Sequence, residues 1–256
     1  MRVDLNADLG EGFGPWRMGD DAALLDLLTS ANVACGGHAG DADTMVETLE
    51  LARARGVVVG AHPGYADPAG FGRRVIPMTA RAIERMVATQ IGALMGAAAL
   101  AGVRVAYVKA HGALANLAAD EVAVAQAVAR AVAAVSRDLG LLAISGTALE
   151  PAGRDCGLRV FSEVFADRAY LPNGRLVPRS QPGAVIEDAD AAVARLVGFV
   201  QTGLMPVLDG PPITLAAESI CVHGDSPGAV AMARAVRERL EASGVQIRSF
   251  MDKAAA

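Results

Sequence analysis

All four histidines of the 256-residue chain stand at or just after the end of a short apolar run. The runs read NVACGGH, VVVGAH, YVKAH and SICVH, and they end in His38, His62, His111 and His223. A single imidazole is often only structural, but imidazole also transfers protons near neutral pH and binds metals. In a parallel α/β barrel the carboxyl ends of the strands meet at one mouth, where side chains converge. The four positions together predict a histidine-rich site at such a mouth.

Lys109 is one of two lysines in the chain, and it precedes His111 by two residues. Residues i and i+2 of a strand face the same side, so both side chains are predicted to face the mouth. Burial disfavours the charged form of a lysine unless an anion or a carboxylate lies nearby. Two interpretations stay open: Lys109 stabilises charge on a substrate, or it forms a structural ion pair with Asp8 or Glu163.

Carboxylates accompany the histidines. Asp4, Asn6 and Asp8 alternate along one face of the first predicted strand. Asp8, His38 and His62 are a candidate ligand set for a divalent metal, although their spacing matches no H-E-x-x-H or Cys/His finger pattern. The alternative is proton transfer by His38, His62 or His111, with Asp8 orienting the imidazole. A nucleophilic Cys35 or Cys221 is the weaker interpretation, because small buried thiols are common.

The elements that position these residues alternate between short apolar runs and segments of helical period, which indicates repeated βα units in one domain, residues 1–256. The predicted strands are Arg2–Asp8, Ala31–Cys35, Val57–Ala61, Arg104–Ala110, Leu141–Ser145, Arg159–Phe165 and Ser219–Val222. The predicted helices are Asp20–Leu28, Ala42–Ala54, Ala80–Ala101, Glu121–Arg137, Asp188–Thr202 and Pro227–Glu241, with caps at Asp41, Thr79, Asp120, Asp188 and Ser226. The tail GVQIRSF is either an eighth strand or an edge piece. The irregular segment 171–185 is long enough to be a functional loop.

Composition limits the function classes. The net charge of −5 gives no basic field for nucleic acid or for an anionic membrane surface. Three cysteines without C-x-x-C spacing fit a reducing compartment. No basic region followed by an apolar run opens the chain, so a cytoplasmic protein is predicted. GEGFGP breaks the G-x-G-x-x-G pattern and no G-x-x-x-x-G-K-[ST] occurs, so the chain carries no recognisable nucleotide-binding loop.

Seven motifs in fixed order closely resemble the LamB/YcsF family almost end to end. They are DLNADLGEGFG, SANVACGGHAGD, GAHPGYAD, GFGRR, VKAHGALAN, SEVFADRAYLPNGRLVPRS and VHGDSPGA. The resemblance implies an irregular TIM-like (β/α)7 barrel of the glycoside hydrolase/deacetylase type. It also implies ATP-dependent opening of the lactam of 5-oxo-L-proline to L-glutamate, with ATP shared with or bound on partner subunits B and C. Self-association into a homo-oligomer stays open.

The implied reaction assigns further roles as hypotheses. Lys109 would stabilise the developing oxyanion or the phosphoryl group. Arg168, Arg175 or Arg179 would hold the substrate carboxylate in a bidentate contact. The candidate substrate-binding set is completed by Asn6, Glu163, His223 and Asp225. Two alternatives remain: a metal-dependent deacetylase-like hydrolase that uses the same mouth, and a non-catalytic regulatory subunit.

Overall fold

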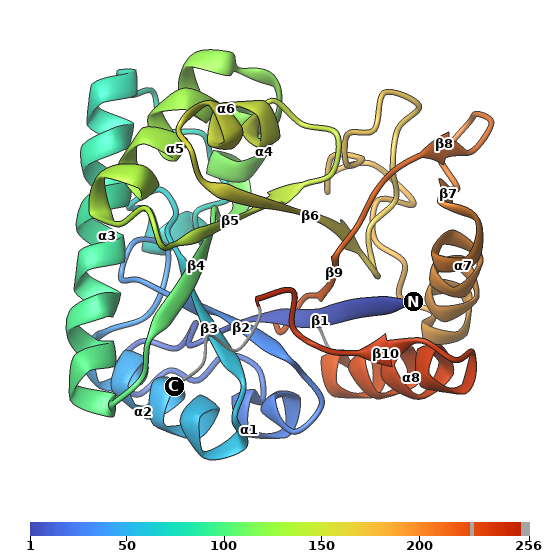
Figure 1. Ribbon diagram of the computed structural model, residues 1–256, viewed down its shortest axis with the longest axis horizontal. Coiled ribbons are helices and arrows are strands. Elements are labelled where there is room, and N and C mark those ends of the chain that lie inside the picture. The colour runs from blue at the N-terminus through green and yellow to red at the C-terminus, as the bar shows by residue number, and fades with distance from the viewer. Residues whose placement is uncertain (226–227, 252–256) are drawn as a thin grey trace.

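Seven parallel strands close into a barrel in the computed structural model, which describes residues 1–225 and 228–251 (Figure 1). The strands are β1 (Arg2–Leu9), β2 (Ser30–Ala34), β3 (Val58–His62), β4 (Val105–Lys109), β5 (Gly140–Ile144), β6 (Arg159–Phe165) and β9 (Ser219–Val222). Each strand pairs with the next, and β9 closes the ring by pairing with both β6 and β1. This confirms the predicted seven-stranded irregular barrel, and every predicted strand end lies within one residue of the observed one.

Two short pairings lie outside the barrel. β7 (Leu204–Met205) and β8 (Ile213–Thr214) form an antiparallel pair between the last two barrel strands. Among the described residues, β10 (Gln246–Ile247) pairs with Arg2 and Val3 at the start of β1 and with no other strand. The tail is therefore an edge piece, and the barrel does not gain an eighth strand from it.

Helices surround the barrel (Figure 1). They are α1 (Asp21–Leu25), α2 (Ala42–Arg55), α3 (Ala80–Ala101), α4 (Gly112–Asp120), α5 (Val122–Val135), α6 (Leu149–Asp155), α7 (Ala189–Thr202) and α8 (Ala229–Ala242), with a 3₁₀ turn η1 at Pro68–Gly70. The sequence patterns missed α4 and α6. Neither begins with a side-chain cap, and α6 contains both Pro151 and Gly153, which predict a turn rather than a helix.

The predicted helix caps have mixed outcomes. The side chains of Asp41, Thr79 and Asp188 accept backbone N–H groups in the first turns of their helices. The prediction for Asp120 was wrong, because this residue ends α4 and its carboxylate binds Arg175 instead. Ser226 lies outside the described residues.

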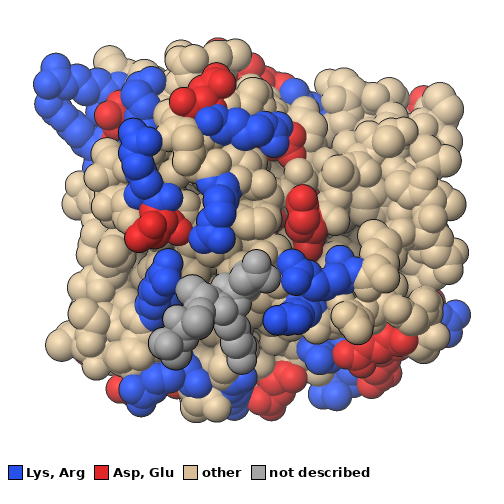
Figure 2. All heavy atoms as spheres, viewed as in Figure 1, with Lys and Arg blue, Asp and Glu red and all other residues tan. Residues whose placement is uncertain are grey.

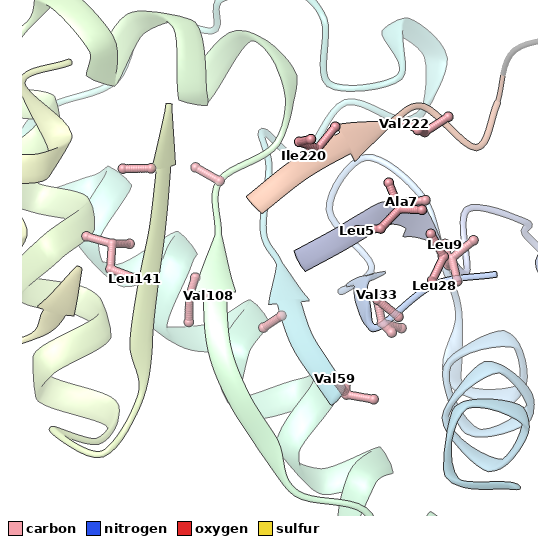
Figure 3. Close-up of a cluster of buried hydrophobic side chains, with 14 of the residues drawn as sticks. Leu5, Ala7, Leu9, Leu28, Val33, Val59, Val108, Leu141, Ile220 and Val222 are labelled. Carbon is pink, nitrogen blue, oxygen red and sulfur yellow. The ribbon is translucent and has the colours of Figure 1, made fainter. Parts of the chain in front are cut away.

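The strands of the barrel separate an apolar layer beneath the helices from a polar centre. Leu5, Ala7 and Leu9 of β1 point outward into the hydrophobic layer between strands and helices, which Figure 3 shows with side chains from neighbouring strands. Asp4 and the alternate residues that follow it point into the barrel and are buried there. Apolar packing against the helices thus leaves the centre of the barrel free for polar side chains.

Phe250 and Met251, the last residues that the structure describes, pack at the amino end of the barrel. Phe250 and Met251 pack with Tyr107 and Leu142 in a separate apolar cluster, and the ring centroids of Phe250 and Tyr107 are 4.9 Å apart. This packing leaves the carboxyl ends of the strands as the open side of the barrel.

The outer surface mixes charges of both signs. Figure 2 shows basic and acidic side chains interspersed on the face seen in Figure 1. Among the described helices, none is both long enough and apolar enough to span a membrane.

Candidate active site

A pocket of about 400 Å³ opens at the carboxyl ends of the strands. Most of the predicted site residues form its wall: Asp8, His62, Lys109, His111, Glu163, Arg168, Arg175, Arg179 and His223. Asn6, His38 and Asp225 are not part of that wall. The pattern of polar strand ends therefore gathers residues from five strands and the long loop around one cavity.

Lys109 lies in the floor of this pocket between two carboxylates. Its Nζ atom is 3.1 Å from Asp8 Oδ1 and 3.1 Å from Glu163 Oε2. Nζ also donates to Asn6 Oδ1 at 3.3 Å and contacts Cys221 Sγ at 3.1 Å. Lys109 thus forms ion pairs with both carboxylates that the sequence offered as partners, Asp8 and Glu163, and its side chain is only 4% exposed.

The charges of this floor are set by burial and by neighbours. Burial raises the pKa of Asp8, but the neighbouring His62 and Lys109 outweigh it and hold that pKa well below its usual value. For Glu163 burial is the larger effect, and its pKa is raised although Lys109 opposes the shift. Burial lowers the pKa of Lys109, yet Asp8 and other anionic partners raise it well above its ordinary value. Lys109 is therefore a permanent cation here.

Beneath the floor, polar groups of the barrel interior satisfy one another. The carboxylate of Asp4 accepts from the hydroxyls of Thr29, Ser30 and Ser219. Asn32 donates to Asn6 at 2.7 Å and to Asp8 at 2.9 Å. Burial raises the pKa of Asp4 to about 6, although the three hydroxyls lower it. This network fixes the rotamer of Asp8, whose carboxylate forms the ion pair with Lys109.

Three histidines and one glutamate form a compact group beside the floor. The ligand atoms of Glu11, His38, His62 and His111 all lie within 4.8 Å of one another. His111 Nδ1 is 3.0 Å from His62 Nε2, and His38 Nε2 is 2.9 Å from Glu11 Oε1. The rings of His38 and His111 are stacked with centroids 3.6 Å apart. We call these four residues the histidine cluster.

The outer nitrogens of two cluster histidines contact backbone carbonyls. His62 Nδ1 is 2.8 Å from the carbonyl oxygen of Lys109, and His111 Nε2 is 2.9 Å from that of Phe71. His38 differs, since its Nδ1 atom is buried without a partner among the described residues. Burial, followed by the neighbouring histidines, lowers the pKa of His38 well below its usual value and that of His111 to about 3. Both rings are neutral at pH 7.

His223 stands apart from this cluster and pairs with Asp167. Its Nδ1 atom is 2.8 Å and 2.7 Å from the two oxygens of the Asp167 carboxylate. Its Nε2 atom makes no hydrogen bond to another residue in the part of the chain that the structure describes, and His223 lines the pocket. Burial raises the pKa of Asp167, but His223 outweighs it and lowers that pKa. A carboxylate that holds Nδ1–H leaves Nε2 able to accept a proton, which is the geometry of a general base.

The predicted arginines differ in their freedom to bind a ligand. Arg168 is buried and donates to the carbonyls of Val177 and Ala184, so it ties down the long loop. Arg175 donates to Asp120 and to a backbone carbonyl. Arg179 is exposed and makes no hydrogen bond or ion pair with any described residue. Of the three, Arg179 is the one available to hold a carboxylate.

Sequence reasoning missed three site residues. Glu11 completes the histidine cluster, Asp167 holds His223, and Arg73 lines the pocket and binds Asp225 at 2.5 Å. Each stands in one of the motifs quoted above: DLGEGFG, SEVFADRAY and GFGRR. The motifs could therefore have indicated these residues. The pattern of polar residues at strand ends could not, because all three lie beyond the predicted strands.

Comparison with known proteins gives consistent relatives over the full length. The sequence profile of the LamB/YcsF family matches residues 3–255. A protein of Nitrobacter hamburgensis, named as the A subunit of 5-oxoprolinase, is 51% identical over 251 residues, covering 98% of each chain. A protein of Azorhizobium caulinodans with the same name is 53% identical over 248 residues, covering 97% of this chain and 98% of the relative.

Solved structures show the same barrel. A lactam utilization protein from Thermus thermophilus matches with a TM-score of 0.92 and 43% identity, covering 98% of this chain and 100% of the other. A putative cellobiose-phosphate cleavage protein from Enterococcus faecalis matches with a TM-score of 0.58 and 11% identity, covering 97% of both chains. The second match shows a shared fold only.

Proposed function

Because this chain belongs to the LamB/YcsF family, we propose that it is the A subunit of an ATP-dependent 5-oxoprolinase, which opens 5-oxo-L-proline to L-glutamate. The relatives that carry this name support the assignment, since they match at about half identity over almost the whole chain. One observation of the site carries the chemical part of the proposal. A permanent cation, Lys109, and a carboxylate-held imidazole, His223, line the same pocket.

The chemistry explains why such groups are needed. A five-membered lactam is a poor electrophile, so we propose that its carbonyl oxygen is first phosphorylated by ATP with release of ADP. Water then adds to that carbon and loses a proton, the ring C–N bond breaks, and the ring nitrogen takes up a proton. A second water releases phosphate from the resulting acyl phosphate. Each step moves a proton or develops negative charge at oxygen.

The residues of the pocket supply these functions in the proposal. His223 Nε2 accepts the proton of the attacking water, with Asp167 holding the tautomer. Lys109 stabilises negative charge that develops above the floor. Arg179, which is exposed and makes no hydrogen bond or ion pair with a described residue, pairs with the substrate carboxylate. A general base contributes about 10²–10⁴-fold to a rate, so the loss of His223 is predicted to be severe but incomplete.

Partner subunits complete the proposal. The names of the relatives describe each of them as one subunit of a larger enzyme, and the sequence has no recognisable phosphate-binding loop. We therefore propose that subunits B and C take part in nucleotide binding, and that the isolated chain neither hydrolyses ATP nor opens 5-oxoproline at an appreciable rate.

The test is glutamate release from 5-oxoproline with ATP, measured for the chain alone and with its B and C subunits. Activity only in the complete mixture is expected, with a 10²–10⁴-fold loss for His223→Gln, on the order of what a general base supplies. Lactam or amide hydrolysis by the chain alone without ATP would instead support the deacetylase-like alternative. Full activity of all pocket variants in an assembled complex would indicate a regulatory role.

A further inference from the structure

In the histidine cluster, backbone carbonyl oxygens determine which ring nitrogen of His62 and of His111 carries a proton. A carbonyl oxygen can only accept, so the contacts at 2.8 Å and 2.9 Å require a proton on His62 Nδ1 and on His111 Nε2. A neutral imidazole carries one N–H, so the inner nitrogens, His62 Nε2 and His111 Nδ1, both present lone pairs. These two atoms are only 3.0 Å apart. Two acceptors at that distance repel each other unless a cation lies between them.

Two carboxylate oxygens lie close to the same point. Glu11 Oε1 lies 3.7 Å from His111 Nδ1 and 2.9 Å from His38 Nε2. Asp8 Oδ1 is 3.3 Å from His62 Nε2, and that carboxylate already has Lys109 as a partner. All four cluster side chains are at most 5% exposed. Bulk water and mobile ions therefore cannot screen this concentration of lone pairs.

We propose that Glu11, His38, His62 and His111 form a binding site for one divalent first-row transition metal ion of the Zn²⁺ type. The donor chemistry supports this class, because three imidazoles and one carboxylate suit Zn²⁺ and its transition-metal neighbours better than Mg²⁺ or Ca²⁺. The spacing fits as well. With metal–nitrogen bonds of about 2.0–2.1 Å, two nitrogens 3.0 Å apart subtend an angle of roughly 91–97° at the ion, somewhat narrower than the tetrahedral angle of about 109°.

The surroundings of the cluster also match those of a metal site. Histidine ligands usually donate their second N–H to a carbonyl or a carboxylate, which orients the ring, and His62 and His111 both do so. His38 lacks this support, so it is the weakest of the proposed ligands. His62 and His111 also line the pocket, so an ion held by them lies next to the bound substrate. The inference stands whether or not the proposed lactam chemistry is correct.

The rival explanation is a proton shared between His62 and His111, which would make one of them an imidazolium without any metal. The two explanations differ in stoichiometry. The metal site predicts one bound ion per chain, whereas the shared proton predicts that no ion is bound.

The experiment uses the full chain without a histidine tag, treated with chelator and then titrated with Zn²⁺ and, separately, with Co²⁺. We expect one ion per chain by elemental analysis, visible absorption bands from bound Co²⁺, and a higher Tm in the presence of Zn²⁺. Outer-shell contacts alone typically change metal affinity 10–100-fold, so loss of a direct ligand in Glu11→Gln or His62→Ala is expected to weaken Zn²⁺ binding by at least about 100-fold.

The matched control is His223→Ala, which removes a histidine of the same pocket outside the cluster and should leave Zn²⁺ stoichiometry and affinity unchanged. Glu11→Gln preserves side-chain shape, and unfolding curves of each variant in the metal-free state are to be measured to establish that it is folded. Absence of stoichiometric binding by the wild-type chain would overturn the proposal. So would unchanged affinity in folded Glu11→Gln and His62→Ala, or NMR signals of an imidazolium at His62 that Zn²⁺ does not alter.

Discussion

Replacing Lys109 with methionine removes the cation that lies between Asp8 and Glu163. Both ion pairs are 3.1 Å long and all three side chains are at most 8% exposed, so no solvent replaces the lost charge. Breaking a buried pair by removing one partner typically costs about 3–5 kcal/mol. For a chain of this size that corresponds to a decrease in Tm of roughly 6–20 °C. The loss should therefore be large enough for thermal and urea unfolding to measure well.

The pH dependence of this loss gives a second measurement. The pKa of Asp8 is depressed in the folded protein, so its contribution to stability is present above its ordinary pKa and is lost as the pH falls through the folded value. The pKa of Glu163 is already raised and rises further without Lys109. At pH 5 the Glu163 carboxylate of the variant can take up a proton, and the resulting neutral group is stable in the barrel without the ammonium group of Lys109. The free-energy difference from wild type should consequently be smaller at pH 5 than at pH 7.

Two further variants separate charge from packing. Adding Glu163→Gln to Lys109→Met removes one uncompensated carboxylate and should restore stability, with a coupling free energy of about 0.5–3 kcal/mol. Arg130→Met is the control, because Arg130 makes a 3.0 Å ion pair with Glu84 while 46% exposed, and its loss should cost at most about 1 kcal/mol. If Lys109→Met costs no more than Arg130→Met, the reasoning is refuted. A stable complex with normal turnover per folded molecule would also remove Lys109 from the proposed chemistry.

Three other predictions test parts of the fold. Gly60→Ala should cost about 1–3 kcal/mol in urea unfolding, because a Cβ there would lie 2.3 Å from the Tyr107 ring, whereas Gly92→Ala meets nothing within 4 Å and should be neutral or slightly stabilising; equal effects would contradict this. Since the pKa of Asp4 is about 6 in the folded protein, the contribution of Asp4 to stability falls as the pH rises from about 4 to 6. In Asp4→Asn the unfolding midpoint should therefore depend less on pH over that range. An unchanged slope of midpoint against pH would count against this. Arg168→Met should destabilise by about 1–3 kcal/mol and speed proteolysis within the long loop, and protease resistance equal to wild type would show that the two carbonyl contacts are dispensable.

The barrel strands were predictable because their pattern has a physical cause. Strands covered by helices need an apolar outer face, and β1 shows the consequence in Leu5, Ala7 and Leu9 alternating with polar residues. The convergence of the histidines follows from the same topology, since parallel strands end at one mouth. By contrast, α4 begins without a side-chain cap, so no local signal marks its start.

The details of the site depended on contacts that no spacing rule describes. Glu11 contacts His38 from a position directly after Gly10, whose φ of 67° favours glycine. In the sequence, Arg168 cannot be distinguished from an arginine that binds a ligand. In the structure its guanidinium group donates to backbone carbonyls of an irregular loop, whose path the sequence does not predict. Asp167 and Arg73 likewise lie on connections whose paths are set by tertiary packing.

The pairing of β1 with β9 has a consequence for how the protein is made. Asn6 and Ser219, which share a hydrogen bond, are separated by 213 residues. At a synthesis rate of about 5–20 residues per second, the first strand leaves the ribosome roughly 10–40 s before its last partner. Throughout that interval the ring is open, and water, not Ser219, solvates the carboxylate of Asp4. Barrel closure is therefore a late event in biogenesis, and the nascent chain exposes an unpaired strand edge until Ser219–Val222 has been translated.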